Sequence, residues 1–351
     1  MMSPKIAIFV STLKIGGAEK QSIFLFNALK YKYETFLIIF YGDIVEGQYL
    51  KLIKDGHGKV IALRGNLTRK ILYLYKFFKA ERITHLFTYL TKPNFYGAII
   101  GRLAGVRFIY PGIRSTVLPA WKIFLEKIAS FFSTAVILNS YAGEYIIKQR
   151  GFKRTCVIPN CLDNISAPIQ KKEKSPIVII SVGRFVEDKD YSTSLNAIGE
   201  LLKVSNNFIY RLVGYGPLEA QLRKKVIELQ LSNNVEIIIK PDNIPQLLND
   251  ADIYLSTSLF EGTSNAIMEA MNACLPIVAT DVGDNNRLIL EGINGFLHGV
   301  GDYKGIAKSL EALMLNYDKR IDWGLESNRI LNKNYSNDIF KAKYLNLIEQ
   351  T

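Results

Sequence analysis

The chain has 351 residues, which indicates two domains because a single hydrophobic core rarely grows beyond about 250–300 residues. Apolar residues make up 48% and charged residues 22%, and no apolar run approaches the roughly 20 residues of a membrane span, so a disordered chain and a membrane-spanning helix are excluded. The net charge of +12 is unevenly divided: residues 1–165 hold 24 Lys and Arg against 9 Asp and Glu, and residues 166–351 hold 20 against 23.

Residues 5–13 form the first predicted strand, since β-branched and aromatic residues dominate them. They lack the charged start and the small-residue cleavage site of a signal peptide. Gly16 and Gly17 follow, and then helix-type spacing, which is the order that opens a doubly wound domain. The two glycines are either a tight turn or a place where the backbone approaches a diphosphate. The dinucleotide fingerprint G-x-G-x-x-G is absent from this turn.

Two helices in the first half combine aromatic and basic residues. Between predicted strands at 34–41, 59–63 and 83–88, residues 67–80 have helical spacing with lysines among the aromatics. Residues 117–132 carry a helical stripe made of Trp121, Phe124, Leu125, Ile128, Phe131 and Phe132. We interpret both helices as core elements with a solvated basic edge. Contact with lipid head groups is the alternative, and it requires the aromatic side chains to be exposed.

The first half ends in a strand at 135–139 and in a segment that contains Pro159, Asn160 and Asp163. Asn160 and Asp163 are turn formers, and we assign them no chemistry. Residues 164–176 are polar and hold two prolines, so they form the predicted interdomain linker.

A second set of strands and helices begins at residue 177. Its first strand ends in Gly183 and Arg184, and Lys189 follows five residues later. Arginine offers a planar fork of donors and lysine a point charge, a suitable pair for the growing charge of a leaving diphosphate. A strand from residue 210 then runs into a turn that begins with Gly214.

The segment 256–276 carries the densest group of candidate site residues. It follows an apolar strand at 252–256 and opens a helix for which Ser264 is the predicted N-cap and Pro276 the end. The first turn of this helix presents free N–H groups that suit a phosphate. Glu261 and Glu269 flank that turn, and because carboxylates repel phosphate, their natural partners are ribose or sugar hydroxyls. The spacing of eight alone is weak, since a second such glutamate pair occurs elsewhere without a helix start between its members.

The segment from Phe260 to Met271 resembles the E-x7-E motif of family 4 nucleotide-sugar glycosyltransferases, which have the α/β GT-B fold of two Rossmann-like doubly wound domains facing a cleft. The segments at Gly183–Lys189 and Gly214–Pro217 resemble further motifs of this family. The resemblance implies an N-terminal acceptor domain of residues 1–165 plus a returning helix at about 336–351, and a C-terminal donor domain of residues 166–335. It also implies retaining transfer of a sugar from a nucleotide diphosphate, UDP or GDP, to an acceptor hydroxyl.

The same resemblance implies roles for single residues. Glu261 holds hydroxyls of the donor sugar, Glu269 holds the ribose, and Arg184 with Lys189 draws off the diphosphate. The remaining donor-binding positions are Gly16, Gly17, Gly183, Gly214, Gly262, Thr263, Ser264 and Asn265.

The chain departs from the family pattern in several places. Many relatives have a histidine in the first domain where this chain has Arg114, and arginine cannot act as a general base at neutral pH. We expect the acceptor proton to pass to the departing phosphate, with Arg114 as a clamp; an ordinary surface cation is the alternative. Ile239 stands where relatives usually have glycine, and Asp284 and Arg287 replace a usual glycine and glutamate.

We expect no metal and no cofactor besides the nucleotide-sugar co-substrate. Three scattered cysteines and three histidines show no metal-ligand spacing and favour a reducing cytoplasm. A cation would also compete with the basic pair for the same phosphates.

For the basic first half we expect contact with an anionic membrane at the inner, cytoplasmic face of the cell membrane and a lipid-linked or cell-surface glycan acceptor. No nucleic-acid-binding motif is found. The alternatives are a non-catalytic sugar- or nucleotide-binding scaffold at the membrane surface and a sugar-nucleotide epimerase of the same fold.

Overall fold

The computed structural model describes residues 3–14, 16–115, 117–168 and 171–351; residues 169 and 170 of the predicted linker lie outside this range. The chain divides into two compact units. The N-terminal unit comprises Met1–Asp163 and Asn337–Thr351, and the C-terminal unit comprises Asn164–Ser336. The first crossing between units therefore comes two residues before the predicted boundary at 165.

The elements of the N-terminal unit alternate between strands and helices along the chain. They are β1 (Lys5–Val10), α1 (Gly17–Leu29), β2 (Glu34–Ile39), α2 (Gly47–Leu50), β3 (Lys59–Ala62), α3 (Leu67–Ala80), β4 (His85–Tyr89), α4 (Thr91–Leu103), β5 (Phe108–Ile113), α5 (Ala120–Phe132), β6 (Val136–Leu138), α6 (Tyr141–Gln149), β7 (Thr155–Val157) and, from the far end of the chain, α14 (Asn337–Glu349).

The C-terminal unit repeats this alternation. Its elements are β8 (Ile177–Arg184), the short 3₁₀ helix η1 (Glu187–Lys189), α7 (Tyr191–Leu202), β9 (Phe208–Tyr215), α8 (Glu219–Glu228), β10 (Val235–Ile239), α9 (Ile244–Asn249), β11 (Ile253–Ser256), α10 (Asn265–Asn272), β12 (Ile277–Thr280), α11 (Asn285–Leu288), β13 (Gly295–His298), α12 (Tyr303–Met314) and α13 (Tyr317–Tyr335).

Each unit is built on one parallel sheet. Among the described residues, the N-terminal sheet has the order β3-β2-β1-β4-β5-β6-β7 and the C-terminal sheet the order β10-β9-β8-β11-β12-β13. The strand order reverses between β1 and β4 in the first sheet and between β8 and β11 in the second. In doubly wound folds, ligands bind outside the carboxyl ends of the strands at this reversal. The expected ligand site of each unit is therefore at the carboxyl ends of β1 and β4 in the first sheet and of β8 and β11 in the second.

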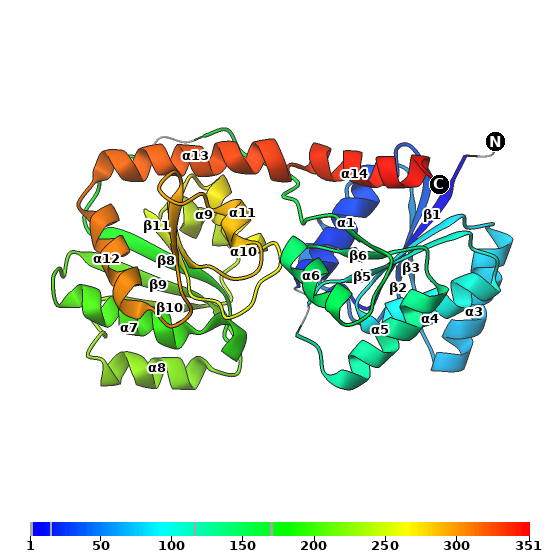
Figure 1. Cartoon of the computed structure of the whole chain (residues 1–351), viewed down its shortest axis with the longest axis horizontal. Coiled ribbons are helices and arrows are strands. Elements are labelled where there is room, and N and C mark those ends of the chain that lie inside the picture. The colour runs from blue at the N-terminus through cyan, green and yellow to red at the C-terminus, as the bar shows by residue number, and fades with distance from the viewer. Residues whose placement is uncertain (1–2, 15, 116, 169–170) are drawn as a thin grey trace. The chain divides into compact units, whose positions relative to one another are not determined.

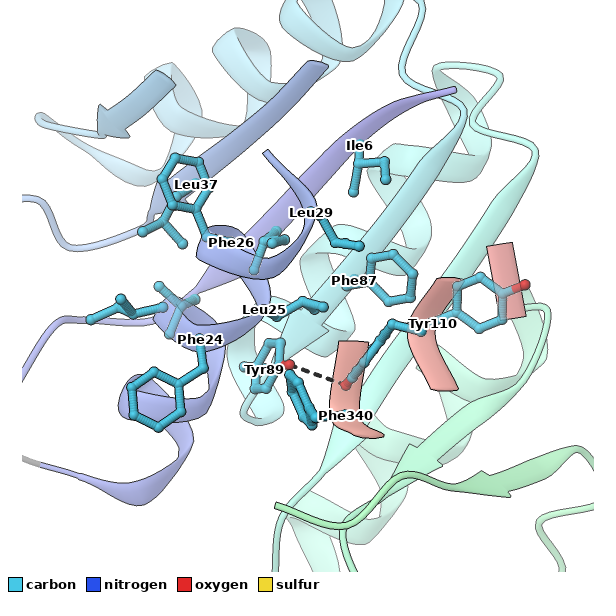
Figure 2. Packing of buried hydrophobic residues seen from close by; sticks show 14 of the residues in the cluster. Ile6, Phe24, Leu25, Phe26, Leu29, Leu37, Phe87, Tyr89, Tyr110 and Phe340 are labelled. Carbon is cyan, nitrogen blue, oxygen red and sulfur yellow. Dashed lines mark hydrogen bonds between the residues drawn. The ribbon is translucent and has the colours of Figure 1, made fainter. Parts of the chain in front are cut away.

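The core of the N-terminal unit follows from the alternation of side chains along its strands. In β1, Ile6, Ile8 and Val10 pack against α1 and α14, whereas Ala7 and Phe9 pack in the layer beneath α3, α4 and α5. Figure 1 shows these two groups of helices on opposite sides of the sheet. Figure 2 shows Phe340 of α14 packed close to Tyr89 at the end of β4, so the last helix completes the first core.

The prediction that the aromatic stripe of residues 117–132 belongs to the core is wrong for three of its members. Trp121 is 57% exposed, Phe124 63% and Phe131 77%, because α5 buries its opposite side, with Glu126 and Ala129, against the sheet and α4. Helix α3 is intermediate, since Leu74 and Phe78 are buried while Leu72 and Tyr73 are exposed. No helix in the described part of the chain is both long enough and apolar enough to cross a membrane.

Candidate functional site

Glu261 lies in the loop after β11, with its carboxylate nearly enclosed. Lys189 Nζ donates a hydrogen bond to Glu261 Oε1 at 2.5 Å, and Ser258 Oγ donates to the same oxygen at 2.9 Å. The side chains of Lys189 and Glu261 are only 22% and 11% exposed, so solvent screens this ion pair weakly. The two residues for which the sequence predicts separate roles therefore meet directly.

Arg184 and Lys189, predicted as a pair, differ in their surroundings. Arg184 is the last residue of β8 and is exposed, and among the described residues it forms no ion pair. Lys189 ends the short helix η1 and is paired with Glu261. Arg184 is thus the cation open to an anionic ligand, whereas Lys189 must exchange a partner to bind one.

Helix α10 begins where the sequence predicts, with Ser264 as the N-cap residue. The Ser264 side chain accepts no capping hydrogen bond. Thr263 and Ser264 are buried, and Asn265 is the first helical residue. The amino end of the helix follows Glu261 and Gly262 directly in the chain, so anion-favouring N–H groups stand beside the Lys189–Glu261 pair.

Both glutamates lie near the buried Tyr254 of β11. Burial is the main cause of the raised pKa of the Tyr254 hydroxyl, and the charges of Glu261 and Glu269 raise it further. The Tyr254 hydroxyl donates to the carbonyl oxygen of Val182 at 3.3 Å. In the chain, Glu261 precedes α10 and Glu269 lies within it.

A small pocket lies beneath Glu261. Its walls include Ser181 of β8, Tyr191 of α7, Tyr254 of β11 and Ala266 of α10, together with Lys189 and Glu261. Neither tyrosine nor Ser258 was among the predicted site residues. A signal for them does exist, since Tyr254 and Ser258 belong to the strand end and hydroxyl-rich turn that lead to Glu261.

Two glycines allow the site loops to approach one another. A Cβ on Gly214 would lie 1.8 Å from the carbonyl oxygen of Gly183, which explains the close contact of the ends of β8 and β9. Gly283, with φ of +59°, brings its backbone so near to Glu261 that a Cβ would lie 2.1 Å from the Glu261 carbonyl oxygen. Gly283 therefore helps to fix the Glu261 loop, and the sequence alone did not reveal this role.

In the N-terminal unit, Arg114 follows β5 and is partly buried. Its guanidinium carbon lies 4.4 Å from the centre of the Tyr89 ring. Its two terminal nitrogens donate long hydrogen bonds of 3.5 Å, one to Asn160 Oδ1 and one to the Tyr344 hydroxyl of α14. Arg114 is thus held at the carboxyl edge of the first sheet and is not an ordinary surface cation.

The glycine turn of the N-terminal unit is already occupied by groups of the protein. The Gly16 N–H donates to the Tyr49 hydroxyl at 2.9 Å, and that hydroxyl donates to the Gly16 carbonyl oxygen at 3.0 Å. Glu19 is buried in the first turn of α1, where it accepts from Thr12 Oγ1 at 3.3 Å. The predicted diphosphate contact must therefore come from Gly17 or follow a rearrangement of Gly16.

Three of the family departures lie in the C-terminal unit. Ile239 ends β10 and is 36% exposed, and Lys240 follows it with a positive φ of 45°. Asp284 is buried at the N-cap of α11, while Arg287 is exposed. Within the described residues, no group of three or more His, Cys, Asp and Glu side chains could hold a metal ion.

Comparison with known proteins identifies the class of fold. The structure of Anabaena Alr3699/HepE in complex with UDP-glucose is similar over 99% of this chain and 100% of that one, with a TM-score of 0.85 and 20% identity. The sucrose-phosphate synthase of Thermosynechococcus elongatus is similar over 99% and 98%, with a TM-score of 0.81 and 16% identity. The chain has the GT-B fold, as expected.

Sequence comparison adds a match to a family model. Residues 163–329 match the model described as glycosyl transferases group 1, and the chain resembles the nucleotide-sugar glycosyltransferases of family 4. The amylovoran biosynthesis glycosyltransferase AmsK of Erwinia amylovora is 34% identical over 143 residues, which are 38% of this chain and 35% of AmsK. The UDP-Gal:alpha-D-GlcNAc-diphosphoundecaprenol alpha-1,3-galactosyltransferase of Escherichia coli is 26% identical over 270 residues, which are 69% of each chain. The chain thus spans about a third of the length of AmsK.

Proposed function

We propose that this protein is a metal-independent, retaining glycosyltransferase that moves a sugar from a UDP or GDP sugar to an acceptor hydroxyl. The observation that carries the proposal is the meeting of Lys189, Glu261 and the amino end of α10 at the carboxyl edge of the second sheet. This edge offers cationic and N–H groups for a diphosphate and carboxylates for hydroxyls. The names of the UDP-sugar-dependent galactosyltransferase and of the UDP-glucose complex favour a UDP sugar.

In the proposed reaction, the bond between the anomeric carbon and the diphosphate oxygen breaks while the acceptor oxygen bonds to that carbon. The leaving diphosphate gains negative charge, which Arg184, Lys189 and the α10 amides stabilise. The backbone amides of Gly262, Thr263 and Asn265, at or just before the start of α10, also contribute to binding of the diphosphate. Glu261 orients the transferred sugar and Glu269 the ribose. The acceptor proton passes to the departing phosphate, with Arg114 as an additional positive charge.

Release of UDP or GDP from a panel of sugar nucleotides, with and without lipid-diphosphate-linked acceptors, tests the proposal. We expect acceptor-dependent release from one donor, full activity in EDTA, and retained anomeric configuration in the product by NMR. Free sugar or free nucleotide without an acceptor would favour the epimerase or a hydrolase. Binding without any turnover would favour the sugar-binding scaffold.

We further propose that the N-terminal unit contacts an anionic membrane at the cytoplasmic face and that its acceptor is lipid-linked. Support comes from the exposed Trp121, Phe124 and Phe131 on α5, beside Lys122 and the exposed Lys127. Exposed aromatics next to lysines suit the boundary between head groups and acyl chains. The acceptor named for the Escherichia coli relative, a diphosphoundecaprenol-linked sugar, agrees with this placement.

The two tryptophans provide a built-in probe for this contact, because Trp121 is 57% exposed and Trp323 only 8%. In a Trp323→Phe variant, vesicles with phosphatidylglycerol should shift the fluorescence of Trp121 to shorter wavelength, and phosphatidylcholine vesicles should not. No shift with either vesicle, with Trp121 still exposed, would contradict membrane contact through α5.

A further inference from the structure

Among the described residues, two donors of different kinds form hydrogen bonds to the carboxylate of Glu261. Ser258 Oγ and Lys189 Nζ both bond to Oε1, and Oε2 is the carboxylate oxygen outside both bonds. The serine donor is neutral and belongs to the same loop as Glu261. The lysine donor is charged and comes from the segment after β8. The arrangement leaves one oxygen of Glu261 to accept from a sugar hydroxyl.

A bound diphosphate would attract one of these two donors, Lys189, but not the other, Ser258. A bound diphosphate competes with Glu261 for the ammonium group of Lys189, because both are anions and a lysine chain is flexible. Ser258 carries no charge for a diphosphate to attract. It is 1% exposed, and its carbonyl oxygen accepts from Thr280 Oγ1 at 2.6 Å, which anchors its backbone to β12. The serine bond is thus the one that persists when Lys189 turns away.

We propose that Ser258 is a positioning residue that holds Glu261 Oε1 while Lys189 is engaged by the diphosphate, so that Oε2 remains in place for the transferred sugar. This inference rests on the proposed donor site. The two contacts to Glu261 Oε1 then have different roles. Lys189 neutralises Glu261 when the site is empty, and Ser258 orients Glu261 when the donor is bound. A carboxylate that loses its cation without such a donor would be free to rotate toward water.

The test compares ligands with and without the sugar. Isothermal titration with UDP-glucose and with UDP, or with the donor that the wild type turns over and its matching nucleotide, measures the two affinities. Ser258→Ala should weaken binding of the sugar nucleotide roughly 10-fold or more, the usual effect of losing a hydrogen bond to a charged group, and should leave UDP binding within about 2-fold. Ser258→Thr, which keeps the hydroxyl, should restore most of the lost affinity.

Ser194→Ala is the matched control. Ser194 is also fully buried in the C-terminal unit, and its hydroxyl accepts from Tyr210, but it does not touch Glu261. This variant should bind both ligands like the wild type, and thermal melting checks that both alanine variants are folded. Equal loss of UDP and sugar-nucleotide affinity in Ser258→Ala, or no loss of either, would overturn the inference.

The two proposals fail separately. If the wild type binds sugar nucleotides but never transfers the sugar, the proposed function is wrong. The effect of Ser258→Ala on sugar-nucleotide binding, compared with its effect on nucleotide binding, still tests the inference. If the wild type transfers the sugar normally, but Ser258→Ala has the same ratio of sugar-nucleotide to nucleotide affinity as the wild type, only the proposed role of Ser258 is wrong.

Discussion

The two units share a doubly wound plan but place their charges differently. In the C-terminal unit, the central lysine of the site is neutralised by Glu261 within the unit itself. In the N-terminal unit, Arg114 rests on the Tyr89 ring and has no carboxylate partner among the described residues. The first arrangement prepares a site for a ligand with both an anion and hydroxyls. The second leaves positive charge available, as does the excess of 24 Lys and Arg over 9 Asp and Glu in residues 1–165.

Removal of the paired lysine is expected to have the largest effect. Lys189→Met keeps the length of the side chain but removes the charge that stabilises the leaving diphosphate, so kcat should fall by about 10²–10³. Lys224→Met is the control, because Lys224 is exposed and its ion pair with Glu228 lies at the surface. A rise in KM with unchanged kcat would show that Lys189 binds the donor and its transition state equally well.

A buried carboxyl group in the N-terminal unit has a shifted pKa. Glu126 of α5 is 2% exposed and accepts from Asn94 Nδ2 at 2.9 Å; burial raises its pKa from 4.5 to about 7. Since the folded state holds this proton more tightly than the unfolded state, the stabilisation is complete below pH 4.5 and is lost as pH rises through 7. The loss amounts to about 3 kcal/mol.

Glu126→Gln removes that titration and should flatten the fall of the melting temperature between pH 5 and 8. The variant should melt above the wild type at pH 8 if Asn94 keeps its acceptor. His85 supplies an internal check of opposite sign, because burial lowers its pKa from 6.5 to about 4 and stability is lost as pH falls through this range. Because the His85 effect can offset that of Glu126, the comparison is between the two proteins: a Glu126→Gln variant whose melting temperature follows the same pH profile as the wild type would contradict the assignment to Glu126.

Arg114 tests whether the unpaired charge of the first unit is used in the reaction. Arg114→Ala should reduce turnover by about 10- to 100-fold, the range for loss of one charge-assisted contact in the transition state. Arg107→Ala is matched to it, since Arg107 also stacks on an aromatic ring, that of Phe108 at 5.0 Å, but is exposed at the start of β5. Unchanged turnover of the true substrate in Arg114→Ala would remove Arg114 from the mechanism.

Sequence reasoning succeeded where local pattern determines structure. Helix α3 begins and ends at the predicted residues, and α10 starts after Ser264 as expected. These segments have strong periodicity or clear start and stop residues. The GT-B fold followed from motif resemblance, and the comparisons confirm it.

The failures come from packing between segments that are distant in sequence. Periodicity identifies the apolar face of α5 but not whether a neighbour covers it, so the exposure of Phe131 was missed. The bond between Lys189 and Glu261 joins residues 72 positions apart, and nothing in either segment alone indicates it. Gly283 gives no local sign of its contact with the Glu261 backbone. In the sequence, the Gly16 turn resembles a diphosphate-binding turn. In the structure, the Gly16 N–H instead donates to the hydroxyl of Tyr49, which comes from a later helix.

The smallest expected effect concerns the return of α14 to the first unit. The Tyr344 hydroxyl is fully buried and lies 3.2 Å from the Tyr89 hydroxyl and 3.5 Å from Arg114 Nη2. Tyr344→Phe keeps the ring and removes one hydroxyl, so the unfolding free energy should fall by about 1 kcal/mol.

The kinetic consequence separates two roles of α14. If the helix only completes the core, kcat in Tyr344→Phe should stay within about 2-fold of the wild type, and Tyr335→Phe, a similar change in the C-terminal unit, should behave alike. A larger fall of kcat in Tyr344→Phe alone, at equal stability, would mean that the last helix orients Arg114. Chemical denaturation and steady-state kinetics on both variants decide between these outcomes. A packing defect lowers the unfolding free energy in either variant but gives no specific fall of kcat in Tyr344→Phe.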